Sequence, residues 1–549
     1  MDREEITRRL ALLRKRIQEG KFHVAPHLRE GFETSLKRIR TAQDGLVDET
    51  TVDGRIRSTL LIVAYHADRE EWKNLVSLRQ IQEAYFDHLQ MVFGQQFEMM
   101  IKAKADPYHF AEWFASDQGR VKDTIEIADE FVSGTLEFWE NISGPTWIHL
   151  EDSTDSKAVF TGEIFPDGRS NFVSSTGIYF DTTVLPDPFL KMAPLFTHMD
   201  EQDRLTEILR LGLQVLQYRD LAIADVSKPV VAVLPDRHGL EENYRKFIHD
   251  CASDDTVIHA ERLFGKAFTD VEELADFLKS FKTSSDIVAS LQQPDELVFA
   301  TEWHGSLSDH IDRFVVENGS KLGIEVPGQA VFLHLLSRFS QANDSYQRSR
   351  ELRGTPVVRA ETSWLWFNWM LRSNAQALDD EALTGLHIAR ALGTTIKKEI
   401  SWLGNVPPAA LIEIRRTGAL DEIRALLGTG IKELVSARPD NFHRTGDKVF
   451  ENLYAAFHAH EKQLDVLRLK KWKFAGLDVG SFFVVGGIEM TAALTGLPFY
   501  GAAAVAASRL GVIPTAKDLK EKFGKLKAEG TKVNSTGVGL LFKHGRRDV

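Results

Sequence analysis

The sequence predicts a mainly α-helical, multidomain protein with a smaller central α/β region that contains a short mixed or antiparallel sheet. First, its 549 residues exceed the length at which one hydrophobic core stops growing, so two to four domains are expected. Second, apolar residues recur at intervals of three and four through residues 1–144 and 301–467. Third, short β-branched and aromatic runs interrupt this pattern within residues 145–300. Residues 468–549 form a fourth region, which is hydrophobic with basic flanks.

The N-terminal region, residues 1–144, is expected to consist of amphipathic helices. The runs LALLRKRI, TLLIVAYHADREEWKNLVSLRQIQEAYFDHLQMVF and DTIEIADEFVSGTLEFW all repeat apolar residues at helical spacing. The chain has no repeat with a period of 20–50 residues, so the sequence gives no support to a solenoid.

The central region, residues 145–300, begins with four runs of the kind found in strands: TWIHL, AVFTGEIF, NFVSS and GIYFDTTVL. Between the second and third, Pro166-Asp167-Gly168 has the residues that a tight turn requires, which predicts a small antiparallel sheet. A helical stretch at 188–222 follows. PVVAVLPD at 229–236 has the unbroken apolar run of a buried central strand, so we expect residues 230–233 to be almost fully buried.

From residue 301 onward the pattern is helical again. SWLWFNWMLR at 363–372 carries three tryptophans close together, which only a well-buried helix can accommodate. DEALTGLHIARALGTTIKKEISWL at 380–403 is amphipathic. In 449–467, apolar residues and His460 form one stripe at helical spacing.

Composition and charge bear on compartment and partners. The single cysteine, Cys251, excludes an internal disulfide and a multi-cysteine zinc site, and the first twenty residues lack the apolar core of a signal peptide. Both features predict a cytoplasmic protein. The net charge is −12, of which the last 82 residues contribute +8 and residues 1–467 contribute −20. An acidic body disfavours nucleic acid and anionic lipid, so contact with nucleic acid is expected only through the basic C-terminal tail.

Several common catalytic motifs are missing from the sequence. It contains no GxxxxGK[ST], GxGxxG, HExxH, GxSxG or paired CxxC. Their absence argues against P-loop nucleotide hydrolysis, dinucleotide chemistry of the usual kind, zincin proteolysis and α/β-hydrolase chemistry. An enzyme is not excluded, because many active sites are assembled from residues that are distant in sequence.

Two acidic residues are candidates for a catalytic metal site. Asp181 follows GIYF and Asp236 follows VVAVLP, so both are expected at the ends of strands. Ligands and metals gather beyond the carboxyl ends of strands in open α/β sheets, and two carboxylates there could hold Mg²⁺ for phosphodiester or phosphoryl chemistry. The alternative is that each aspartate caps a helix or turn.

A second candidate metal site lies in AFHAHEKQLD. His458 and Glu461 are three residues apart on one face of an expected helix, which is a spacing that allows two metal ligands. The alternative is a core histidine, His460, beside a solvated helix face. Neither candidate implies a cofactor other than a metal ion.

The C-terminal segment 474–513 is strongly apolar, with nineteen uncharged residues between Glu489 and Arg509. That length approaches the thickness of a bilayer. Glycines around Pro498 could form the bend of a helical hairpin, and basic residues flank both sides. We expect two helices that pack as soluble core on the 449–467 stripe. The alternatives are reversible membrane association and permanent insertion.

Together these patterns favour an intracellular, non-enzymatic helical protein that acts through a protein partner or self-association. Segment 474–513 would be its contact or oligomerisation element. One alternative is a metal-dependent hydrolase or nuclease on region 145–300, which alone would require Mg²⁺. The other is a membrane-targeting effector, by analogy with bacterial defence systems.

Overall fold

The computed structural model describes residues 3–20, 22–167, 172–373, 380–394, 406, 408–437, 445, 447–449, 451–452, 455–456, 459, 473–474 and 477–478. Contacts divide the chain into two compact units, Met1–Ile81 with Asn141–Ser153, and Gln82–Glu140 with Thr154–Val549. The four regions expected from the sequence stay a prediction. The protein is mainly helical, as expected.

The first unit contains α1 (Arg3–Gln18), α2 (Pro26–Arg38), the 3₁₀ helix η1 (Glu49–Thr51) and α3 (Gly54–Leu75). Their apolar faces form one core that includes Ile6, Leu10, Phe32 and Ile56. The amphipathic helices predicted for this part of the chain are confirmed.

Two long helices follow, α4 (Leu78–Ala103) and α6 (Gln118–Glu151), with the shorter α5 (Pro107–Ala115) between them. The run TWIHL, predicted as a strand, forms the C-terminal end of α6, so that prediction is wrong. Trp147, Ile148 and Leu150 are buried there. A short apolar run at the end of a helix has the same composition as a buried strand, and periodicity cannot separate the two.

The second unit continues through the following elements: β1 (Lys157–Thr161), α7 (Phe172–Thr176), β2 (Thr182–Pro186), α8 (Pro188–Phe196), α9 (Glu201–Leu216), α10 (Arg219–Ala222) and β3 (Val231–Leu234). Next come α11 (Arg237–Leu240), α12 (Glu242–Phe264), α13 (Val271–Lys279), α14 (Ser284–Ser290), η2 (Pro294–Glu296), α15 (Leu307–Leu322), α16 (Pro327–Glu351), β4 (Thr355–Val358), α17 (Glu361–Ser373) and α18 (Asp380–Thr394). The last described elements are α19 (Pro408–Arg416), α20 (Leu420–Gly428), α21 (Ile431–Ala437) and the paired strands β5 (Lys473–Phe474) and β6 (Leu477–Asp478).

The central sheet has four parallel strands in the order β3-β2-β1-β4. Val159 of β1 aligns with Val184 of β2 on one side and with Pro356 of β4 on the other. The prediction of a mixed or antiparallel sheet is therefore wrong. NFVSS, expected as a strand, includes α7, which links β1 to β2 as a crossover rather than a hairpin.

Helices cover both faces of this sheet. Phe160 and Thr161 are adjacent in β1 and therefore point to opposite faces. Phe160 meets Phe172 of α7 at a ring-centroid distance of 4.8 Å, whereas the Thr161 hydroxyl donates to Ser345 of α16 at 2.6 Å. Thr355 of β4 lies against Gly385 of α18. Helices α7 and α18 thus cover one face, and α16 covers the other.

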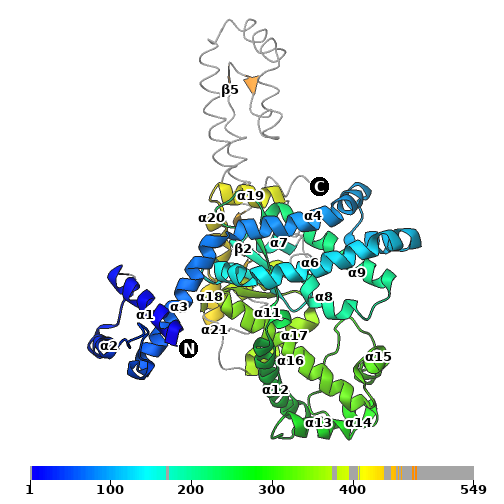
Figure 1. The fold of residues 1–549 in the computed structure, drawn as a ribbon. Coiled ribbons are helices and arrows are strands. Elements are labelled where there is room, and N and C mark those ends of the chain that lie inside the picture. Colours follow the sequence, from blue (N-terminus) through cyan, green and yellow to red (C-terminus); the bar gives the residue numbers. More distant parts are fainter. Residues whose placement is uncertain are drawn as a thin grey trace, which may run out of the picture. The chain divides into compact units, whose positions relative to one another are not determined.

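The long connection from β3 to β4 is a helical assembly with its own core. In Figure 1, α12 runs beside α16, and α13, α14 and α15 gather at one end of the pair. Helix α17 contributes the predicted tryptophans, Trp364, Trp366 and Trp369, all of which are buried in this core. The expectation that SWLWFNWMLR forms a buried helix is confirmed.

Strand β3 lies where PVVAVLPD predicted a strand, and residues 230–233 are each 0% exposed, as expected. It is an edge strand rather than a central one. Gln82 of α4 takes the place of a further strand. The backbone N–H of Val233 donates to the Gln82 side-chain oxygen at 2.7 Å, and Gln82 Nε2 donates to the Val233 carbonyl at 2.9 Å. One side chain thus satisfies two buried backbone groups of the edge.

Replacing Gln82 by leucine is expected to lower the free energy of unfolding by roughly 2–4 kcal/mol, because a buried N–H and a buried C=O lose their partners. Urea denaturation compares Gln82→Leu with Gln202→Leu, which changes an exposed glutamine of α9. A loss for Gln82→Leu no larger than that for Gln202→Leu contradicts this role.

Some predictions concern residues outside those that the structure describes. They include the hairpin in 474–513, apart from Phe474, Leu477 and Asp478, and most of the 449–467 stripe. Both stay predictions. Within the described parts of the chain, no helix combines the length and the apolar character needed to cross a bilayer.

Candidate oxyanion-binding pocket

The strand order defines where the chain reverses direction across the sheet. From β1 the chain proceeds to β2 and β3 on one side, and then returns to add β4 on the other side of β1. In such sheets the loops after the two strands separate at this switch point, and ligands bind beyond the carboxyl ends of the strands. A ligand site is therefore expected at the carboxyl ends of β1 and β4.

A hydrogen-bond network ties these two strand ends together. The Gly162 carbonyl, directly after β1, accepts hydrogen bonds from Gln341 Nε2 at 2.7 Å and from the Ser363 hydroxyl at 2.8 Å. Gly162 has φ +83°, and a Cβ there would lie 2.8 Å from Val358 Cγ1. Only glycine fits this close left-handed turn without strain.

Glu163 reaches from the end of β1 to the turn after β4. Its carboxylate accepts the backbone N–H of Ala360 at 3.0 Å, which fixes the turn that leads into α17. Burial raises the pKa of Glu163, and the Ala360 N–H and the positive charge of Arg359 oppose that shift. Glu163 is thus a structural link that also places a carboxyl group near Arg359.

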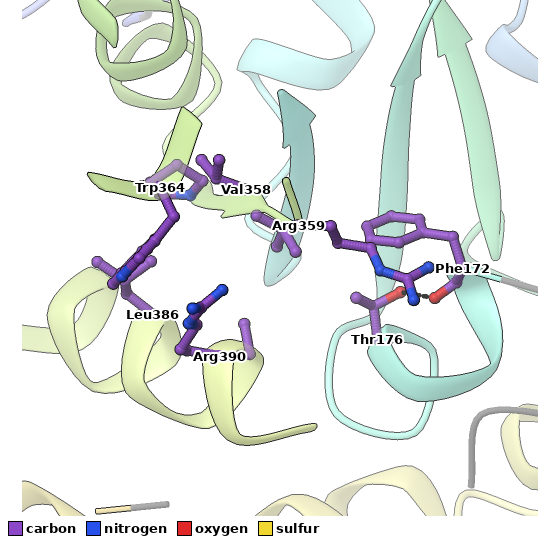
Figure 2. A pocket seen from close by; sticks show the side chains of 10 residues that line it. Phe172, Thr176, Val358, Arg359, Trp364, Leu386 and Arg390 are labelled. Carbon is purple, nitrogen blue, oxygen red and sulfur yellow. Dashed lines mark hydrogen bonds between the residues drawn. The ribbon is translucent and has the colours of Figure 1, made fainter. Parts of the chain in front are cut away.

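Beside this switch point is an open pocket between the end of β4, α7 and α18 (Figure 2). Its empty volume is about 430 Å³, open solvent at the mouth included. The lining residues are Phe172, Thr176, Pro356, Val357, Val358, Arg359, Trp364, Leu386, Ala389 and Arg390. Backbone, aliphatic and aromatic groups form most of the wall, and the charged groups among these residues are two guanidinium groups.

The two arginines reach the pocket from different elements. Arg359 directly follows β4 and extends across Phe172, with its guanidinium carbon 5.8 Å from the ring centroid (Figure 2). Arg390 rises from α18 and lies over Trp364, with its guanidinium carbon 4.7 Å from the ring centroid. Arg390 Nη2 also donates to Glu361 Oε2 at 2.5 Å. Each guanidinium is thus held against an aromatic face.

The Thr176 hydroxyl is already engaged by protein atoms. It donates to the Phe172 carbonyl at 3.4 Å and lies 3.1 Å from the Thr183 hydroxyl of β2. The groups of the pocket best suited to a ligand are therefore the arginines. A guanidinium has five N–H donors in a planar fork and binds carboxylate and phosphate oxygens through charge-assisted hydrogen bonds.

Asp181, the first candidate of the sequence, lies at the amino ends of the strands, opposite to the end where the pocket lies. It precedes β2, because GIYF forms a turn after α7 instead of a strand. Its carboxylate accepts the Ser156 N–H at 3.0 Å and pairs with Arg424 at 3.0 Å and Lys228 at 3.3 Å. Burial would raise the pKa of Asp181, but the Ser156 hydrogen bond and Arg424 hold it below its usual value.

Asp236, the second candidate, lies just beyond the carboxyl end of β3, as expected. It is buried, with one oxygen 2.8 Å from Arg348 Nη2 and the other 3.4 Å from Lys191 Nζ. Both cationic groups come from helices packed on the strand end, α16 and α8. Asp236 therefore serves as the counterion of a buried cation.

The two aspartates are not brought together. The β2–β3 register aligns Thr183 with Val231, so Asp181 lies level with Pro229 and roughly 20 Å along the strand direction from Asp236. One cation needs oxygens within 2.0–2.6 Å of itself. The structure therefore does not bring Asp181 and Asp236 together around one magnesium ion. Among the described residues, no group of three His, Cys, Asp or Glu side chains is placed to hold a metal ion. His458 and Glu461 lie outside those residues.

The sequence did not reveal the arginines of the pocket. The only local signal was TPVVR, a β-branched run followed by arginine, and it is too short to identify a strand. Comparison of the chain with known protein families, with curated proteins and with solved structures finds no match. The class that the described architecture defines is a parallel, doubly wound α/β unit with a large helical insertion.

Proposed function

We propose that the protein binds a small molecule with a phosphate or carboxylate group in the pocket between β4, α7 and α18. The observation that carries this proposal is that Arg359 and Arg390 line one open pocket beside the switch point of a parallel sheet. Charge-assisted hydrogen bonds from arginine to oxyanions are among the strongest polar interactions available to a protein.

The walls of the pocket favour a ligand with an anionic group rather than one with an aromatic group. The ring faces of Phe172 and Trp364 are covered by the guanidinium groups themselves, and both rings are buried. They hold the arginines in place and are not exposed for stacking on a ligand. The aliphatic side chains Val357 and Leu386 line the wall beside the cationic groups, and a wall of low polarity strengthens the attraction of a cation for an anion.

The roles expected from the sequence stand apart from this proposal. Association through 474–513, or membrane contact by the same segment, stays a prediction. A hydrolase built on Asp181 and Asp236 gains no support, because these residues lie at opposite ends of the neighbouring strands β2 and β3.

Loss of either pocket arginine is expected to weaken anion binding roughly tenfold or more, because each charge-assisted hydrogen bond contributes about 1.5–3 kcal/mol. Isothermal titration of the full-length protein with orthophosphate, pyrophosphate and citrate tests this for Arg359→Gln and Arg390→Gln. The three probes separate phosphate from carboxylate ligands.

The chain offers a matched control in Arg313. Its guanidinium lies 4.3 Å from the ring centroid of Trp303 and pairs with Glu317 at 2.7 Å, as Arg390 does with Trp364 and Glu361. Arg313→Gln should leave binding unchanged. The proposal fails if none of the three anions binds the wild-type protein, or if the pocket variants bind as tightly as Arg313→Gln.

A further inference from the structure

One arginine of the oxyanion pocket, Arg390, is already paired with a carboxylate of the protein itself. Glu361 is the first residue of α17 and follows Arg359 by two positions. Its Oε2 accepts the hydrogen bond of Arg390 Nη2 at 2.5 Å. Among the described residues, no other hydrogen-bond partner of the Arg390 side chain is found. Arg390, one of the two cationic residues of the pocket, is thus paired with an internal anion.

The geometry around Arg390 shows how this pair is held. Glu361 and Trp364 are three residues apart on α17, so both side chains lie on one helix face. Arg390 crosses that face, with its plane over Trp364 and its edge on the Glu361 carboxylate. The ring therefore holds the guanidinium, and Glu361 accepts from Arg390 Nη2 a hydrogen bond that a bound oxyanion could accept instead.

The two members of the pair differ in exposure. The Arg390 side chain is 18% exposed, whereas that of Glu361 is 53% exposed. Because the Glu361 carboxylate is largely exposed to solvent, its ion pair with Arg390 is weak, and a ligand can replace the carboxylate at little cost. The displaced Glu361 remains solvated and stays at the N-terminus of α17, where a negative charge is favourable.

We infer that Glu361 is a built-in competitor that occupies Arg390 in the unliganded protein and is displaced by the bound phosphate or carboxylate. This inference rests on the proposed function. Glu361 then sets the affinity and selectivity of the pocket. Only an anion that binds Arg390 better than the Glu361 carboxylate does can break the Arg390–Glu361 ion pair.

Glu361→Gln removes the competing charge and keeps the side-chain length. We expect orthophosphate to bind this variant about two- to fivefold more tightly than the wild type, the factor that corresponds to loss of an exposed ion pair. Glu361→Ala should show at least the same gain. The matched control is Glu317→Gln, which makes the same charge change beside Arg313 and should leave the Kd unchanged.

Titration of the full-length variants distinguishes the failures of the two proposals. If none of orthophosphate, pyrophosphate and citrate binds either the wild type or Glu361→Gln, the proposed function fails. If the anion that binds the wild type binds Glu361→Gln equally, or binds Glu361→Gln more weakly, the competitor role is overturned while the pocket remains. An equal gain for Glu361→Gln and Glu317→Gln would also overturn it, because only the net charge would then matter.

Discussion

Replacing Arg348 by methionine is expected to lower the free energy of unfolding by roughly 3–5 kcal/mol, because buried carboxylates lose their counterion. The Arg348 side chain is 4% exposed and lies 2.8 Å from Asp236 and 2.9 Å from Asp344. The Tyr244 hydroxyl donates to Asp344 at 3.1 Å. Burial would lower the pKa of Arg348, but the two aspartates raise it, so the cation remains charged.

Urea denaturation followed by tryptophan fluorescence measures this loss. The control is Arg350→Met, which changes an exposed arginine of the same helix and should alter stability by less than about 0.5 kcal/mol. Asp236→Asn in the Arg348→Met background should recover part of the loss, because it removes one of the two carboxylates that lost the Arg348 ion pair. A loss below about 1 kcal/mol in Arg348→Met would contradict the role assigned to the pair.

The helical assembly between β3 and β4 buries two histidines in their neutral form, so acid is expected to destabilise it. Burial lowers the pKa of His334 to about 3, with a smaller contribution from Arg338. Burial also lowers the pKa of His259 to about 4, and Arg262 adds to this shift. Arg262 donates to His259 Nδ1 at 3.2 Å, while Nε2 faces the Glu296 carbonyl at 2.9 Å. Protonation of His259 would therefore set an N–H against the Arg262 donor.

The sign of the pH effect follows from linkage. Above about pH 6.5 both histidines are neutral in the folded and the unfolded chain, so they do not reduce the free energy of unfolding. Below it the unfolded chain binds protons that the folded chain does not bind. Stability therefore falls as the pH decreases toward 4 for His259 and toward 3 for His334, by roughly 3 and 5 kcal/mol in full.

Denaturation curves at pH values between 7.5 and 4.5 test this expectation. His334→Gln and His259→Gln should show a shallower fall of the unfolding free energy than the wild type. His198→Gln, at an exposed position of the chain, should keep the wild-type slope. Parallel slopes for all four proteins would show that other groups cause the acid sensitivity.

The features that the sequence revealed are those encoded by neighbouring residues. The unbroken apolar run at 230–233 identified β3, and the tryptophans of 363–372 identified a buried helix. Whether a sheet is parallel or antiparallel is not encoded by neighbouring residues. It depends on whether the segment after β1 turns back or crosses over. Phe172–Ser175 of NFVSS belong to helix α7, in which Phe172 packs on Phe160 of β1.

Strand β4 escaped prediction for two physical reasons. It is only four residues long, and it contains Pro356, a residue that argues against a strand. Pro356 is tolerated because β4 lies at the edge of the sheet, where one side needs no further backbone partner. Without β4, the switch point and its neighbour Arg359 could not be located.

The residues of the candidate site likewise depend on contacts between distant parts of the chain. Asp236 was placed correctly beyond a strand, but its partner Arg348 lies far away in the chain and makes it a buried counterion. Arg359 and Arg390 lie 31 residues apart on a strand end and a helix, and the intervening sequence carries no sign that they share a pocket. Such a site becomes visible only from the fold.

The position of β4 also bears on how the protein is synthesised. Val159 finds its partner Val184 soon after both leave the ribosome, but its other partner, Pro356, is translated about 170 residues after Val184. At about 5–20 residues per second, one side of β1 stays unpaired for roughly 10–35 s. An open apolar strand edge readily pairs with another chain. The nascent protein therefore passes through an interval in which β1 needs protection from aggregation, and a chaperone that covers this edge would raise the yield of folded protein.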